Sequence, residues 1–130
     1  MRILSFGGGV DSSAILLTHL MVEDLGIDQV VFADTGAESK GTYNNVAFFQ
    51  QLCSNQNLPF TIVKHKHETI TEWVTKNGTV PVMAGGNHVC SKRFKGDVIA
   101  EWVSSSFSAD TKITYLIGIE ADEMGRKQRF

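Results

Sequence analysis

Residues 3–20 read ILSFGGGVDSSAILLTHL, and this junction between a strand and a helix decides the fold. The apolar residues within 3–6 predict a short buried strand. The three glycines at 7–9 permit positive φ and leave room for a ligand beside the backbone. The apolar residues of 14–20 predict a helix, and residues 11–13 are expected to cap its N-terminus. Because a helix N-terminus carries unpaired N–H groups and a partial positive charge, the junction favours a bound phosphate.

Two common nucleotide motifs fit this loop poorly. A Walker A loop needs a lysine, and none stands before Lys40. A GxGxxG dinucleotide fingerprint would have its third glycine where this chain has Ser12, although Asp34 stands about 20 residues on, where such proteins place a ribose-binding acid. Asp11 would repel a bare pyrophosphate, but it suits phosphates that arrive with Mg²⁺.

The segment GGGVDSS resembles the PP-loop, SGGxDS, of the ATP pyrophosphatases and adenine nucleotide alpha hydrolases, with Gly7 in place of the usual first serine. The wider string SFGGGVDSSA, followed by VFADTGAE, is most similar to the phosphoadenosine phosphosulfate (PAPS) reductase-like branch, which bacteriophages often encode. The resemblance implies an adenine nucleotide, ATP or a relative, bound with Mg²⁺ at Asp11. The nucleotide-binding residues that it implies are Ser5, Gly7, Gly8, Gly9, Val10, Ser12, Ser13, Asp34, Thr35 and Gly36.

Length and composition describe an ordinary globular protein. The chain has 130 residues, of which 42% are hydrophobic and 20% charged, and a net charge of -2. This charge gives no clear nucleic-acid footprint, and no apolar run is long enough to span a bilayer. With no signal peptide and only two cysteines, a reducing, cytoplasmic location is expected, in the host cytoplasm if the protein is phage-encoded.

Strand and helix patterns alternate along the whole chain. After the first strand and helix, strands are expected over 29–33, 60–63 and 113–117, and helices over about 43–55, 69–74 and 97–103. This pattern predicts an α/β fold: a single domain over 1–130 with an open, mostly parallel sheet flanked by helices, similar to a Rossmann fold. The resemblance implies that it lacks the C-terminal extension of larger relatives.

The segment FADTGAE places Asp34, Thr35 and Gly36 directly after the second expected strand. Because ligands bind outside the carboxyl ends of parallel strands, these residues are expected at the same sheet edge as the glycine loop. Asp34 would bind a ribose hydroxyl or a metal, and Thr35 and Gly36 would line the adenosine. The alternative is a capped turn, for which Asp and Gly are common residues. Thr42 and Tyr43 add to the resemblance, since this segment borders the nucleotide in the family.

A cationic cluster, Lys92, Arg93 and Lys95, precedes the helix expected at 97–103. It would hold a phosphate, a sulfate or an acidic substrate, or it is simply a solvated run of charges. The resemblance assigns Lys95 to the anionic end of the ligand.

The C-terminal segment IGIEADEMGRKQRF partly resembles the GxRxxES..R pattern of the same family, in which an arginine reaches the phosphates. Arg126 is the best match and Arg129 the second. The alternative is a polar tail of mixed charge.

Several other residues are expected to be structural. His65 and His67 have HxH spacing on a strand end, but a surface or packing role is favoured over a zinc site. A structural role is favoured for Cys53 and for Cys90, with a nucleophile or an iron–sulfur ligand as the alternatives for Cys90. Trp73 and Trp102 are expected in the core.

The favoured function is cleavage of ATP between the α and β phosphates, with adenylation of an unidentified acceptor and release of pyrophosphate. In this hypothesis Asp11, Lys95 and Arg126 are the catalytic residues. A nucleotide-binding or sequestering phage factor without turnover is one alternative, and a PAPS or adenylylsulfate reductase is another. The reductase is disfavoured because the ECGxH-type cysteine tail is missing from the sequence. Two alternatives stay open for what related enzymes build after the final arginine motif: a homo-oligomer or a partner subunit supplies it, or the protein is a minimal nucleotide-binding form.

Overall fold

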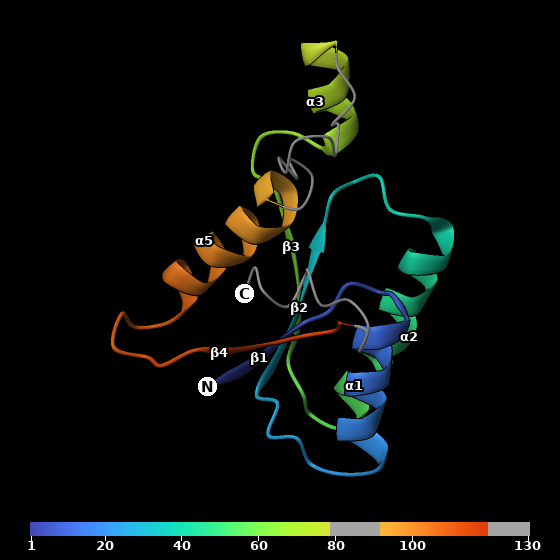
Figure 1. Ribbon diagram of the computed structural model, residues 1–130, viewed down its shortest axis with the longest axis vertical. Helices are drawn as coiled ribbons and strands as arrows, with labels where there is room; N and C mark the ends of the chain where they lie inside the picture. Colours follow the sequence, from blue (N-terminus) through green and yellow to red (C-terminus); the bar gives the residue numbers. More distant parts are fainter. Residues whose placement is uncertain (79–91, 120–130) are drawn as a thin grey trace. The chain divides into compact units, whose positions relative to one another are not determined.

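The computed structural model describes residues 1–78 and 92–119 and contains a four-stranded parallel sheet flanked by helices (Figure 1). The strands are β1 (Arg2–Ser5), β2 (Gln29–Asp34), β3 (Phe60–Lys64) and β4 (Thr114–Ile117), in the order β3-β2-β1-β4. The helical elements are α1 (Val10–Met21), α2 (Lys40–Asn55), α3 (Ile70–Asn77), the π-helical turn η1 (Lys92–Gly96) and α5 (Asp97–Ser106). The predicted α/β class is confirmed.

The element boundaries differ from the expected ones where capping decides them. Helix α3 begins one residue later than expected because Thr69 is its N-cap, in a capping box with Glu72. It continues to Asn77 because Gly78, with φ of 65°, provides the left-handed residue that ends it.

The described residues form two compact units. Unit 1 comprises Met1–Phe32, Gly41–Thr61 and, from the C-terminal part, residues 112–119. Unit 2 comprises Ala33–Lys40 together with the described residues of Ile62–Thr111. Strands β2 and β3 each contribute residues to both units.

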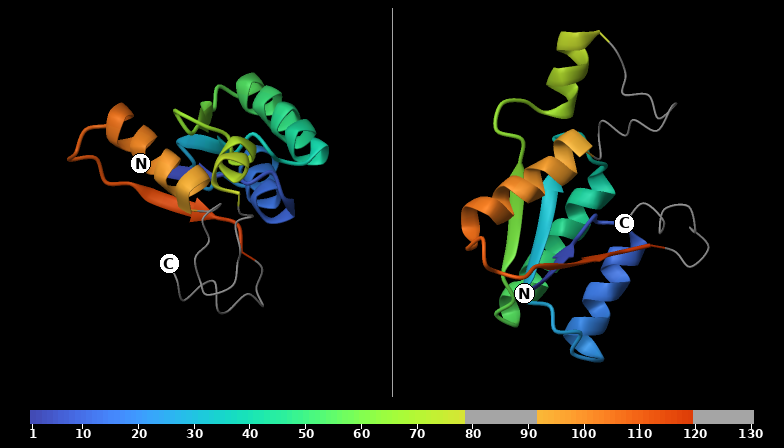
Figure 2. Two further views of the ribbon diagram at one scale, coloured as in Figure 1. Left: turned by 90° about the horizontal axis from the view of Figure 1, so that it is seen from above. Right: turned by 60° about the vertical axis from the view of Figure 1, so that its left-hand side comes forward.

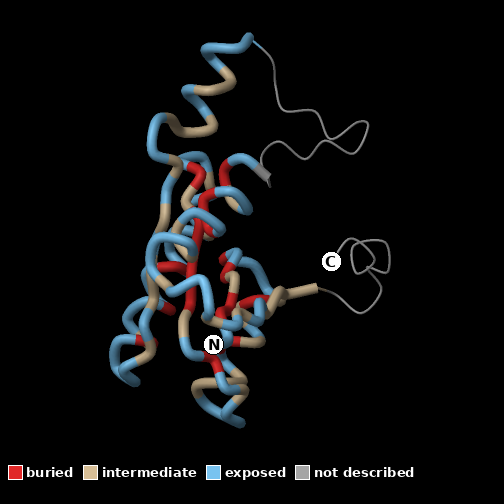
Figure 3. The backbone as a smooth tube through the Cα atoms, turned by 90° about the vertical axis from the view of Figure 1, so that its left-hand side faces the viewer, coloured by how far each residue is buried: buried red, intermediate tan, exposed pale blue. Residues whose placement is uncertain are grey.

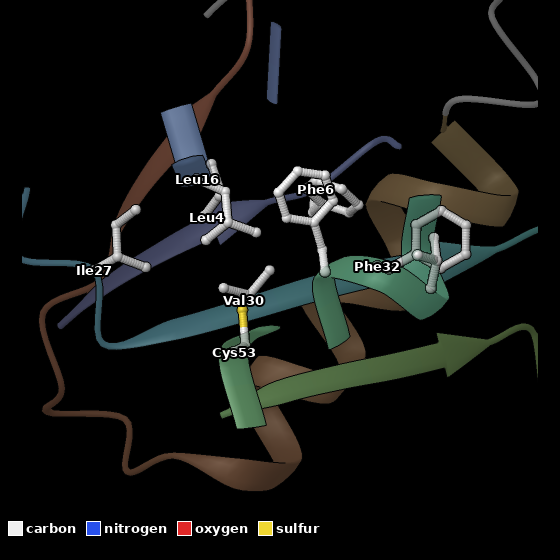
Figure 4. Packing of buried hydrophobic residues seen from close by; sticks show 9 residues of the cluster. Leu4, Phe6, Leu16, Ile27, Val30, Phe32 and Cys53 are labelled. Atoms are coloured by element: carbon white, nitrogen blue, oxygen red, sulfur yellow. The ribbon is translucent and has the colours of Figure 1, made fainter. Parts of the chain in front are cut away.

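The core of unit 1 lies between its strands and the helices α1 and α2. The two helices lie side by side in both views of Figure 2. Alternate strand residues, such as Leu4 and Val30, share one face of the sheet because side chains alternate along a strand. Phe6 stacks at a tilt on Phe49, with ring centroids 5.1 Å apart. The buried cluster that fills this space consists of Leu4, Phe6, Leu16, Ile27, Val30, Phe32, Val46, Phe49 and Cys53 (Figure 4).

Strand residues whose side chains lie on the other face of the sheet are buried as well. Ile3 and Val31 have no exposed surface, so β1 and β2 are buried on both faces, as is usual for parallel strands. Buried residues are accordingly concentrated along the strands in Figure 3. This burial on both faces explains why adjacent residues of each strand, Ile3 and Leu4 in β1 and Val30 and Val31 in β2, are apolar.

Unit 2 has a smaller core around Phe94, which is fully buried. Its ring lies 5.3 Å from the His65 ring and 6.5 Å from the Trp73 ring, measured between centroids. Trp73 and Trp102 are only partly buried, so the prediction that they are core residues is wrong. Each indole covers the edge of an aromatic neighbour, which for Trp102 is Phe107. Among the described helices, none is long and apolar enough to cross a membrane.

Burial of Cys53 predicts an alkaline loss of stability. Desolvation raises the pKa of this thiol from 9.0 to about 11. Between these values the unfolded chain has released a proton that the folded chain still holds. The contribution of Cys53 to the free energy of unfolding is therefore fully present below about pH 9 and falls as the pH rises towards 11. Urea unfolding of the wild type and Cys53→Ala near pH 8 and near pH 10.5 measures the effect. We expect the wild type to lose more stability between the two pH values than the variant, and equal losses would contradict the prediction.

Candidate functional site

The glycine loop leads from β1 into α1 within unit 1. Phe6 N–H still donates to the Val31 carbonyl at 2.9 Å, so the loop begins directly after the paired strand. Gly9 is the N-cap of α1 in an extended conformation, and Ser13 N–H donates to its carbonyl at 3.2 Å. The prediction that residues 11–13 cap this helix is therefore wrong: they lie in its first turn, and no side chain caps it. The cause is Gly9, which begins the helix two residues earlier without a capping side chain.

Ser12 closes the loop on itself. Its hydroxyl oxygen accepts a hydrogen bond from Gly7 N–H at 3.1 Å, and the residue is buried. The Gly7 amide and the Ser12 hydroxyl therefore have each other as partners, and this bond holds the loop's curvature. Both were expected to contact the nucleotide, and the structure gives both a role in the shape of the loop.

Gly8 is the point where helix α2 holds the loop. Its φ of 76° lies in the left-handed region, and a Cβ there would stand 2.7 Å from Thr42 Cγ2. The Asn45 side-chain amide donates to the Gly8 carbonyl at 3.1 Å. Thr42 belongs to a segment that the resemblance places beside the nucleotide, whereas Asn45 was missed. No local signal identifies Asn45, since 37 residues separate it from Gly8.

The backbone after β4 lies against the first turn of α1. A Cβ on Gly118 would stand 2.6 Å from the Ser12 amide nitrogen and 2.8 Å from Asp11 Cβ. Strand β4 pairs with β1 on the side opposite β2, so the strand order reverses at β1. Ligands of open α/β sheets bind outside the carboxyl ends of the strands at such a reversal. The segments after β1 and β4 therefore border the position at which this fold class binds ligands.

The first turn of α1 retains donors that lack partners. Within residues 1–78 and 92–119, the buried Ser13 hydroxyl oxygen has no hydrogen-bond partner. The first amides of a helix have no carbonyl to bind within it, and here no side chain replaces one. Gly9 and Val10 are exposed, and a Cβ on Gly9 would meet nothing within 4 Å. This arrangement of amides and a hydroxyl suits a phosphate group.

Asp11 is the acidic residue of this first turn and is partly exposed. In the described part of the chain, no three His, Cys, Asp or Glu side chains gather as a metal site. A site of this kind fits Mg²⁺ that is bound by one carboxylate, by phosphate oxygens of the nucleotide and by water, which is the usual arrangement for this ion.

In unit 2 the DTG segment forms a tight turn after β2. An Asp34 carboxylate oxygen accepts from Gly36 N–H at 2.8 Å, and the buried Thr35 hydroxyl accepts from Ala37 N–H at 3.3 Å. Gly36 has a φ of 80°, and a Cβ there would stand 2.6 Å from Thr69 Cγ2. The capped turn weighed as the alternative is thus formed, and its contacts explain Asp34 and Gly36 without a ligand. That these residues also bind the nucleotide stays a prediction.

Within the cationic cluster, Arg93 and Lys95 are paired with carboxylates. Arg93 lies 2.9 Å from a Glu68 oxygen, and Lys95 Nζ lies 3.2 Å from a Glu38 oxygen. The side chains of Glu38 and Glu68 are 17% and 13% exposed, so the two carboxylates are largely removed from water. From the sequence, this cluster had two interpretations, an anion site and a solvated run of charges. The ion pairs were expected under neither interpretation.

Several predicted residues lie outside the described residues, namely Arg126, Arg129 and Cys90. The histidine pair falls within them. His65 Nδ1 accepts from the backbone N–H groups of His67 and Glu68, both at 3.3 Å, which agrees with the structural role favoured for it.

Comparison of the chain with protein-family models, with curated proteins and with solved structures finds no match in any of the three.

Proposed function

We propose that the loop between β1 and α1 binds the phosphates of an adenine nucleotide together with Mg²⁺. The observation that carries this proposal is the first turn of α1, which begins at the exposed residues Gly9 and Val10, contains a buried Ser13 hydroxyl without a partner among the described residues and has no side-chain cap. Asn45 and Thr42 fix the loop from α2, so these donors are held in place before a ligand arrives. Preorganised donors of this kind stabilise negative charge at little cost in reorganisation.

In the reaction that we propose, an acceptor attacks the α-phosphorus of ATP. The bond between the α-phosphorus and the bridging oxygen breaks, the adenylyl group passes to the acceptor, and pyrophosphate leaves with the bond's electron pair. The amides of Gly8, Gly9 and Val10 would bind the β and γ phosphates. Asp11 would hold Mg²⁺, whose charge would offset that of the phosphates. The resemblance supports Lys95 and Arg126 as the cations that neutralise the leaving pyrophosphate. Since the acceptor is the nucleophile, the protein contributes position and electrostatics.

The test is a product assay with two nucleotides. The protein is incubated with Mg²⁺ and either ATP or PAPS, and pyrophosphate, AMP and sulfite are measured beside Asp11→Ala. We expect pyrophosphate from ATP above the level of this control. Nucleotide binding with no product would indicate a nucleotide-binding protein without turnover. Sulfite from PAPS would indicate a reductase. If neither nucleotide binds, the proposed loop function is wrong.

Gly9→Ala is expected to weaken nucleotide binding without a loss of stability. Gly9 has φ of -90° and ψ of -177°, which alanine adopts readily, and its Cβ would meet no protein atom within 4 Å. The fold therefore does not need this glycine, whereas a phosphate resting on the loop would meet the new methyl group. We expect an unchanged melting temperature and about tenfold weaker ATP binding by calorimetry.

Ser54→Ala, on an exposed position of α2, is the matched control and should change neither quantity. Equal affinity of Gly9→Ala and the wild type for ATP would argue against phosphate contact at Gly9.

A further inference from the structure

Glu38 holds Lys95 through one carboxylate oxygen. Lys95 Nζ lies 3.2 Å from Glu38 Oε1, and the Thr35 hydroxyl also lies 3.2 Å from this oxygen, to which it donates. An ammonium group and a hydroxyl thus converge on a single anionic oxygen. Two such donors around one oxygen are also what a phosphate oxygen would require.

Both partners come from backbone that is fixed by its own contacts. Glu38 follows the DTG turn, which the Gly36 contact with Thr69 and the bond from Ile70 N–H to the Thr35 carbonyl hold against the start of α3. Lys95 follows the fully buried Phe94 in η1. The pair therefore differs from the contact between Lys66 and Glu101, whose side chains are 66% and 50% exposed.

The side-chain exposures show which partner a ligand can reach. Lys95 is 41% exposed, whereas Glu38 is 17% exposed. An incoming anion can therefore approach the ammonium group from solvent while the carboxylate stays against the protein. Such an anion would replace Glu38 as the ion-pair partner of Lys95. The nearby Glu38 carboxylate would then repel the anion.

We propose that Glu38 competes with the anionic end of the nucleotide for Lys95, and so limits how tightly anions bind at this cation. The inference rests on the proposed function, which assigns Lys95 to the pyrophosphate end of ATP. Every anion that pairs with Lys95 must displace Glu38. Pyrophosphate with Mg²⁺ offers several oxygens for this exchange. Glu38 is thus a positioning residue that sets how tightly anions bind at Lys95.

The test compares four proteins: the wild type, Glu38→Gln, Lys95→Met and the double variant. Calorimetry measures the affinity of each for magnesium pyrophosphate, for ATP with Mg²⁺ and for inorganic phosphate. Glutamine keeps the shape of the side chain and can still accept from Thr35, but it removes the charge that competes. We expect Glu38→Gln to bind pyrophosphate about 1.5- to fivefold more tightly than the wild type, which is the range of a surface ion pair. Its affinity for inorganic phosphate should rise by a similar factor.

In the Lys95→Met background, Glu38→Gln should change pyrophosphate affinity far less, because the cation for which the two anions compete is gone. A merely structural role for Glu38 would not produce this dependence on Lys95. Glu101→Gln removes the charge of the Lys66 partner and should leave every affinity unchanged. Melting temperatures show whether each variant is folded.

The outcomes separate the inference from the proposed function. If the wild type binds ATP and Gly9→Ala weakens it, but Glu38→Gln leaves pyrophosphate affinity equal or lower, the competition is wrong and the loop function stands. An equal gain in the presence and absence of Lys95 also overturns the competition. If no protein of the set binds ATP or pyrophosphate, both the competition and the proposed function are wrong.

Discussion

Gly118→Ala should destabilise the fold and abolish nucleotide binding together. The new Cβ would stand 2.6 Å from the Ser12 amide nitrogen, 2.8 Å from Asp11 Cβ and 2.9 Å from the Asp11 carbonyl carbon. Two of these atoms belong to the backbone of a helix, so they cannot move aside as a flexible side chain would. The strain is purely steric, since the φ of Gly118 lies outside the left-handed region. Overpacking of this kind costs about 3 kcal/mol, which we expect as the loss in the free energy of unfolding.

The loss of binding follows from which atoms are displaced. The residues that Gly118 touches, Asp11 and Ser12, form the turn that is proposed to hold the metal and the phosphates. Urea unfolding measures the stability, and calorimetry with ATP and Mg²⁺ measures the binding. Gly9→Ala is the matched control for stability, because it adds the same methyl group to the same loop region without a steric conflict. Wild-type stability of Gly118→Ala would contradict the close approach of the segment after β4 to α1.

The fold could be predicted because its signals are local. The apolar runs that include Val30 and Val31 are continuous since the strands are buried on both faces, and glycine or polar residues end each run. Helix α3 was predicted too short because its C-terminus is set by the left-handed Gly78, a conformation that the letter G permits but does not require. The N-cap of α1 was misplaced for a related reason. Serine and aspartate are the usual caps, whereas here Gly9 occupies this position with no side chain.

The candidate site could be predicted only in its contiguous part. The loop at residues 7–13 lies within one stretch of sequence, and its glycines carry a chemical meaning there. Asn45 and Gly118 contact it from far along the chain. Nothing in its own surroundings marks Asn45, and the resemblance of the segment around Gly118 did not predict this contact. The pairing of Lys95 with Glu38 was missed for the same reason. A cationic run in the sequence shows its charges but not the carboxylates that a distant turn brings to it.

Gly8→Ala is expected to cost about 2 kcal/mol and to weaken ATP binding by about tenfold. Two causes contribute, and they can be separated. The φ of 76° is unfavourable for any residue with a Cβ, and the Cβ would stand 2.7 Å from Thr42 Cγ2. Removing that methyl group in Gly8→Ala/Thr42→Ala should relieve the steric conflict and leave the backbone strain, which is about 1 kcal/mol.

The double variant gives this prediction its control. Thr42→Ala alone supplies the reference for the threonine's own contacts, so that a double-mutant cycle isolates the coupling between positions 8 and 42. We expect Gly8→Ala/Thr42→Ala to recover part of the stability and part of the ATP affinity, because the new Cβ then no longer meets Thr42 Cγ2. If the stability costs of Gly8→Ala and Thr42→Ala simply add, the loop is not held against Thr42. If stability recovers while ATP affinity stays low, the backbone conformation at Gly8, and with it the direction of its amide, is what the phosphate requires.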